Sequence, residues 1–100
     1  MILDLMQERA YQEVVKHLTR LEVFAGYGIP TKRACIFPEK CIEGIAFTFY
    51  RHNRDFKGIS VLVKPENYNR LVSFFRQCKK KNDPAGIFDA LPTPELFRIG

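Results

Sequence analysis

The densest group of hydrogen-bond donors in this sequence lies between two apolar segments near its middle. Its members are three bases, one histidine and one aromatic residue: Arg51, His52, Arg54, Phe56 and Lys57. Basic side chains on a two-stranded ribbon can enter a nucleic-acid groove or bind phosphates, and an aromatic ring beside them can stack on a base. The same residues also suit a solvated turn, so the sequence leaves both interpretations open.

His52 is the candidate general base, because it is the histidine with several cations close to it in sequence. Small ribonucleases place a histidine or a carboxylate beside cations that stabilise the charge of the transition state. The tip of a hairpin is a poor platform for such chemistry, since catalytic groups must be held in place by packing. A small nuclease-type toxin is therefore the least favoured function, and we expect no catalytic residues. His17 is expected on the surface of a helix.

A second basic set lies in an early loop and towards the end of a later helix. Its members are Lys32, Arg33, Arg76, Lys79, Lys80 and Lys81. The net charge of +5 favours polyanionic partners, although it is also an ordinary way for a protein to remain soluble. Consecutive lysines also suit a helix C-terminus, where positive charge complements the dipole. The two basic groups would form one binding patch only if the fold brought them together.

The three cysteines, Cys35, Cys41 and Cys78, favour neither a disulfide framework nor a metal site. An odd number of cysteines without a signal peptide predicts free thiols in an intracellular, cytoplasmic protein. Structural zinc sites use paired short spacings, so we expect no metal and no cofactor. Cys35 or Cys41 would be reactive if it were exposed beside a base. No apolar run reaches the roughly 20 residues that span a bilayer, so we expect no membrane partner.

Alternating apolar residues predict an antiparallel hairpin over about residues 44–64. Both arms turn their apolar side chains to the same face if Phe49 pairs with Ile59 and Phe47 with Val61, which leaves residues 53–55 as the loop. A pairing longer by two residues also satisfies this condition. The other face of the hairpin is too apolar to be wholly solvated, because it carries Ala46, Thr48, Tyr50, Phe56, Ser60 and Leu62.

Apolar residues at helical spacing predict two helices that cover this hairpin, one over about residues 4–25 and one over about residues 65–81. A short strand at 34–37 could join the sheet, and residues 93–95 suggest the start of a short C-terminal helical segment. The predicted fold class is α+β, with residues 1–100 forming a single domain. In this fold the core joins Phe47, Phe49, Val61 and Val63 of the hairpin to Leu18, Leu21, Leu71 and Phe75 of the helices.

No motif in the sequence dictates a chemistry, so the favoured function is binding. We expect a small intracellular adaptor, inhibitor or regulatory subunit that contacts another protein through a macromolecular interface around the hairpin. The alternative is a basic nucleic-acid-binding protein that uses the hairpin tip and the Lys/Arg residues. The N-terminal helix could also provide a homodimer interface, although the hairpin needs this helix to cover its apolar face.

Overall fold

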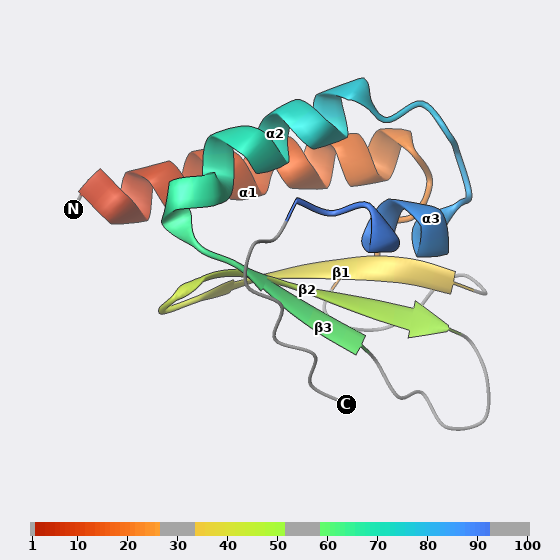
Figure 1. Ribbon diagram of the computed structural model, residues 1–100, viewed down its shortest axis with the longest axis horizontal. Helices are drawn as coiled ribbons and strands as arrows, with labels where there is room; N and C mark the ends of the chain where they lie inside the picture. Colours follow the sequence, from red (N-terminus) through yellow and green to blue (C-terminus); the bar gives the residue numbers. More distant parts are fainter. Residues whose placement is uncertain (1, 27–33, 52–58, 93–100) are drawn as a thin grey trace.

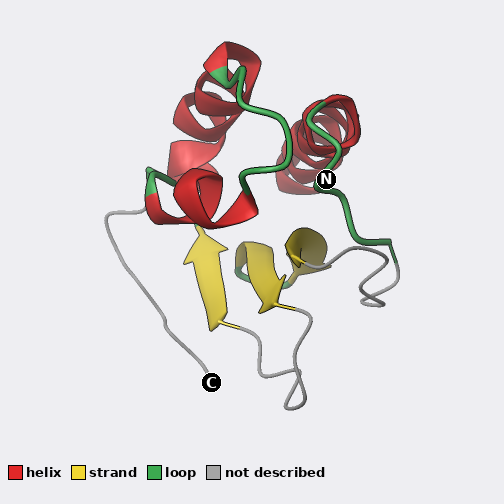
Figure 2. Ribbon diagram, turned by 90° about the vertical axis from the view of Figure 1, so that its right-hand side faces the viewer, coloured by secondary structure: helices red, strands yellow, loops and turns green. Residues whose placement is uncertain are grey.

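A layer of helices covers one face of a three-stranded antiparallel sheet (Figure 1). The computed structural model describes residues 2–26, 34–51 and 59–92. In chain order the elements are α1 (Ile2–Arg20), β1 (Ala34–Cys41), β2 (Gly44–Arg51), β3 (Ile59–Val63), the 3-10 turn η1 (Pro65–Asn67), α2 (Tyr68–Gln77) and α3 (Pro84–Asp89). Figure 2 shows these helices on the same side of the strands. This arrangement confirms the predicted α+β class.

The sheet has the order β1-β2-β3, with β2 in the middle. Between β2 and β3, Phe49 lies opposite Ile59 and Phe47 opposite Val61, which is the predicted register. Strand β1 is longer than the predicted strand at 34–37, because it continues through Pro38 to Cys41 before a two-residue turn leads into β2. A proline has no amide N–H to donate to a neighbouring strand, and here it lies in an edge strand, where this is tolerated.

Helix α1 ends at Arg20, so the predicted extension to about residue 25 is wrong. Leu21 and Glu22 form a turn in which Glu22 has a φ of 62°. The chain then runs beside β1, where the Ile36 amide donates to the Val23 carbonyl at 2.7 Å and the Ala25 amide donates to the Ile36 carbonyl at 2.9 Å. Apolar residues at this point satisfy the helical spacing, but the sheet edge provides their backbone with other partners.

The second helix is also shorter than predicted. Pro65 begins η1, and α2 follows and ends at Gln77, not near residue 81. The C-terminal helical segment is α3, which begins at Pro84, where the Asp83 carboxylate accepts a hydrogen bond of 3.2 Å from the Gly86 amide. Pro84 therefore occupies the first turn of a helix, a position that needs no amide donor. The start predicted at residues 93–95 lies outside the described residues.

The core fills the space between the sheet and the helices. Phe47 stacks on Phe75 with ring centroids 5.9 Å apart, and the rings of Phe49 and Phe88 are 5.6 Å apart. The residues predicted to form the core are all buried in this one cluster: Leu18, Leu21, Phe47, Phe49, Val61, Val63, Leu71 and Phe75. The predicted packing of the hairpin against the two helices is therefore confirmed.

Candidate functional site

The face of the sheet turned away from the helices, which we call the open face, carries a mixture of polar and apolar side chains. Besides the pair Cys35 and Tyr50, strand alternation gives it two rows of three residues: Phe37, Thr48 and Ser60, and then Glu39, Ala46 and Leu62. The hydroxyl oxygens of Thr48 and Ser60 are hydrogen-bonded at 2.9 Å. Glu39 is exposed and the other five side chains are half-buried. None of the described helices packs on this face (Figures 1 and 2).

A cavity of about 430 Å³ lies at one end of the open face, where β1 turns into β2. Its lining, mostly apolar, consists of Cys41, Ile42, Glu43, Ala46, Ser60, Val61 and Leu62. We call it the sheet-face cavity. Ile42 is completely exposed, with a relative accessibility of 105%. Single exposed apolar residues are ordinary on protein surfaces, but a fully exposed isoleucine beside an apolar cavity forms a continuous apolar surface.

The turn that carries Ile42 is fixed by a helix and by a close approach of strands. Gln7 of α1 donates from Nε2 to the carbonyl oxygens of Cys41 at 2.7 Å and of Gly44 at 2.9 Å. Gly44 has a φ of 157°, and a Cβ added there would lie 2.1 Å from the carbonyl oxygen of Val63. Neither Ile42 nor Glu43 has the positive φ that the favoured two-residue hairpin turns use. The shape of the turn therefore depends on Gln7 and on Gly44.

Two carboxylates give the sheet-face cavity an acidic rim. Glu43 lines the cavity, and Glu39 lies in the same row of the open face as Ala46. Neither carboxylate forms an ion pair with another described residue. Burial raises the pKa of the Cys41 thiol, and the nearby carboxylates of Glu39 and Glu43 raise this pKa further. Both negative charges therefore act on a group that lines the cavity.

Lys40, which follows Glu39 in β1, is directed away from this rim. Lys40 points to the helix layer, where its Nζ lies 2.6 Å from a carboxylate oxygen of Glu8 and 5.2 Å from the centroid of the Tyr11 ring. The hydrogen bond between Lys40 and Glu8 lowers the pKa of Glu8 and raises the pKa of Lys40. Lys64 follows β3 beside Gly44, but it is half-buried and does not line the cavity.

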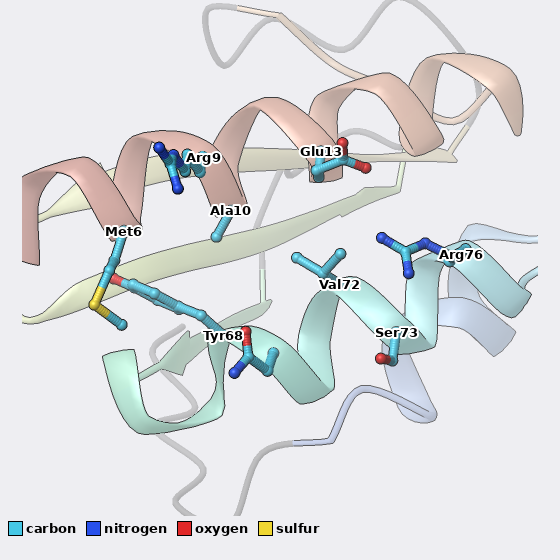
Figure 3. Close-up of a pocket in the computed structure, with 9 residues that line it drawn as sticks. Met6, Arg9, Ala10, Glu13, Tyr68, Val72, Ser73 and Arg76 are labelled. Carbon is cyan, nitrogen blue, oxygen red and sulfur yellow. The ribbon is translucent and has the colours of Figure 1, made fainter.

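A second hollow, of about 420 Å³, lies between α1 and α2 on the far side of the molecule from the open face, and we call it the helix groove (Figure 3). Ala10 and Val72 point into it from the two helices, with Met6 and Tyr68 at one end. The charged side chains around it are Arg9, Glu13 and Arg76. Because a carboxylate lies among the two guanidinium groups, the helix groove has no single sign of charge.

His17, predicted to lie on the surface, is buried with a relative accessibility of 8%. Its Nδ1 accepts a hydrogen bond of 3.3 Å from Nε of Arg20, whose Nη2 also donates to the carbonyl oxygens of Phe75 and Cys78 at 3.2 and 2.9 Å. The Nε2 atom has no hydrogen-bond partner among the described residues, although a carboxylate oxygen of Glu13 lies 3.5 Å away. Burial lowers the pKa of His17, and the positive charge of Arg20 lowers it further. Arg20 therefore links His17 of α1 to the end of α2.

The described members of the predicted basic set lie in two places. Arg76 borders the helix groove, while Lys79, Lys80 and Lys81 follow α2 and are exposed. Lys81 lies 3.7 Å from a carboxylate oxygen of Glu22. Arg51 is the last residue of β2, and Figure 1 shows this end of β2 and the segment after α2 at the same end of the molecule but in different layers. The remaining predicted residues lie outside the described ranges: Lys32, Arg33, His52, Arg54, Phe56 and Lys57.

The three cysteines all lie in described segments, and none of them forms a disulfide, as predicted. Cys35 is fully buried, so the exposure that would make it reactive is missing. The raised pKa of Cys41 disfavours the thiolate, which is the reactive form. Burial also raises the pKa of Cys78. The raised pKa values therefore disfavour the nucleophilic form of both half-buried thiols.

Sequence patterns contain only a partial signal for the sheet-face cavity. The alternation of Ala46, Ser60 and Leu62 marks an incompletely solvated second face, but the strand over 38–41 and the turn at Ile42 were not predicted.

Comparison with protein-family models, with curated proteins and with solved structures finds no match to this chain. None of the helices in the described ranges is long and apolar enough to cross a membrane.

Proposed function

We propose that this chain is a binding protein whose partner is another protein, and that the partner docks on the open face of the sheet beside the β1–β2 turn. The observation that carries the proposal is the fully exposed Ile42 at the tip of a fixed turn, next to the apolar sheet-face cavity. In such a complex the protein would serve as an adaptor, an inhibitor or a regulatory subunit.

The fixed geometry of the turn favours binding. Docking a mobile loop costs conformational entropy, whereas a turn held by Gln7 has already lost that freedom during folding. The energy of most interfaces is concentrated in a few side chains that fill pockets near the centre of the contact. Ile42 is a projecting side chain that could fill a pocket of the partner, and the cavity beside it is a pocket that a side chain of the partner could fill.

Nucleic-acid binding is the competing proposal, supported by the net charge of +5 and the exposed Lys79, Lys80 and Lys81. A salt titration with generic DNA and RNA separates the two proposals. Binding that neutralises several phosphates weakens steeply as salt increases, whereas binding through an apolar contact does not. A steep salt dependence that disappears in a variant with all three lysines changed to serine would favour nucleic-acid binding.

Site-specific photo-crosslinking tests the proposed function. A photoreactive amino acid at position 42 is expected to form one discrete adduct with a protein from the source cells. Excess unmodified protein should suppress this adduct, and the Ile42→Asp variant should not. The matched control is the same photoreactive group at position 5, since Leu5 is also exposed (61%) but belongs to the helix layer. Equal labelling from both positions, or no adduct from position 42, would contradict the proposal.

A further inference from the structure

We propose that the sheet-face cavity binds a large apolar side chain from a protein segment that carries arginine or lysine beside it. This inference rests on the proposed function and specifies the chemistry of the partner. It follows from the lining of the cavity, the charge of its rim and the free edge of β3.

The lining favours an apolar group over a polar one. Ala46, Leu62 and Ile42 present hydrocarbon to the cavity. The Ser60 hydroxyl is already hydrogen-bonded to Thr48 within the sheet. A volume of about 430 Å³ lies within the range of small-ligand pockets, so it accommodates one large side chain and part of its backbone. Burying such a group removes apolar surface from water on both partners.

The rim favours positive charge beside that apolar group. Glu43 lines the cavity and Glu39 lies beside Ala46 in the same row of the open face. Neither carboxylate has an ion-pair partner among the described residues, while Lys40 is held by Glu8 in the other layer. Complementary charges around an apolar centre increase the association rate and exclude partners of the wrong sign. An acidic segment, or the phosphates of a nucleic acid, would be repelled at this position.

The free edge of β3 suits an extended segment. Among the described strands β3 pairs with β2 alone, so no described strand occupies its other edge. A segment added there would pair through its backbone and direct alternate side chains to the open face. Ser60 and Leu62 of β3 line the cavity, so the side chains that the added segment directs to the open face would lie next to it.

The test uses the full chain labelled with ¹⁵N and three short synthetic peptides. Each has the same Leu-Phe-Leu centre, which is flanked on both sides by arginines, by serines or by glutamates. The arginine peptide is expected to shift the amide resonances of residues around the cavity, Ala46 and Leu62 above all. It should bind more tightly than the serine peptide, and the glutamate peptide should bind weakest. Added salt should reduce the difference between them, because these exposed charges are screened.

Variants identify the groups responsible. Changing Glu39 and Glu43 together to glutamine should weaken the arginine peptide by about three- to tenfold and leave the serine peptide unchanged, as expected for two exposed ion pairs. The matched control changes Asp4 to asparagine and Glu66 to glutamine, which removes the same charge from exposed positions of the helical segments. This control should leave both affinities unchanged.

Each contrary result has a separate meaning. Equal binding of the arginine and serine peptides would overturn the charge preference and leave the proposed docking surface in place. If no peptide shifts these resonances although position 42 crosslinks to a partner, the cavity is not the contact, and the inference fails while the proposed function stands.

Two other occupants would also overturn the inference. Shifts of the same resonances that depend on protein concentration, without peptide, would identify a second copy of the chain. Shifts produced by changing Leu96 and Phe97 to serine, without peptide, would identify residues 93–100 of the same chain as the occupant.

Discussion

The two faces of the sheet use neighbouring residues of the same strands for different purposes. On the covered face, Phe47 stacks on Phe75 and Phe49 packs against the tilted ring of Phe88, and both belong to one buried apolar cluster. On the open face, Thr48 and Ser60 are hydrogen-bonded through their hydroxyl groups, and a cavity with an acidic rim lies at one end. Because side chains alternate along a strand, each residue that stabilises the fold is followed in sequence by a residue of the face proposed to bind a partner.

The sharpest test of this division compares two adjacent residues. Phe47→Ala should lower the free energy of unfolding by about 3–5 kcal/mol, because it leaves a cavity between the sheet and α2. Thr48→Ala should lower it by less than about 1.5 kcal/mol, since it removes one half-buried hydrogen bond to Ser60. Urea denaturation of both variants measures the difference. Equal losses would mean that the open face is as tightly packed as the covered face.

A smaller effect is expected at the β1–β2 turn. Gly44→Ala should destabilise the protein by about 1–3 kcal/mol, because the added methyl group would overlap the carbonyl oxygen of Val63 and push β3 away. Gly26→Ala is the matched control, since a Cβ there would lie 3.4 Å from the Phe24 ring, an ordinary contact. If both variants melt at the wild-type temperature, the close approach of the strands at Gly44 does not constrain the turn.

The smallest effect on stability is expected from acidification, through the buried His17 of α1. The pKa of His17 is lower in the folded protein than in the unfolded chain, so the unfolded chain binds the proton first as the pH falls. Stability should therefore be retained above the unfolded pKa of about 6.5 and decrease over the pH range below it, before most carboxylates titrate. His17→Gln should reduce this dependence in denaturation curves recorded across that range. An unchanged dependence would assign the effect to other groups.

Sequence patterns predicted those parts of the fold in which local and tertiary preferences agree. The register of Phe47 opposite Val61 follows from alternation alone, because a shift of one residue would expose every apolar side chain of one arm. Patterns failed where two structures satisfy the same spacing. Residues 21–25 fit a helix, but residues 21–22 form a turn and residues 23–25 lie along β1. The strand predicted at 34–37 continues through Pro38 to Cys41, because an edge strand tolerates a proline.

The candidate site was harder to predict because no local signal marks the turn at Ile42. Ile42 looks like one more apolar residue until the turn and Gln7 are placed together, across a sequence separation of more than thirty residues. His17 was misplaced for a similar reason. Its burial depends on Arg20 and on the end of α2, which lies far along the chain.

The most direct test of the central proposal is the affinity for the protein that crosslinks at position 42. Ile42→Ser should leave stability within about 0.5 kcal/mol of wild type, because the side chain contacts little within the fold. It should nevertheless weaken partner binding by about tenfold or more, as expected for a residue at the centre of an interface. Changing Lys79, Lys80 and Lys81 together to serine should leave the affinity nearly unchanged. The reverse pattern, with loss of binding in the lysine variant and none in Ile42→Ser, would contradict the proposal.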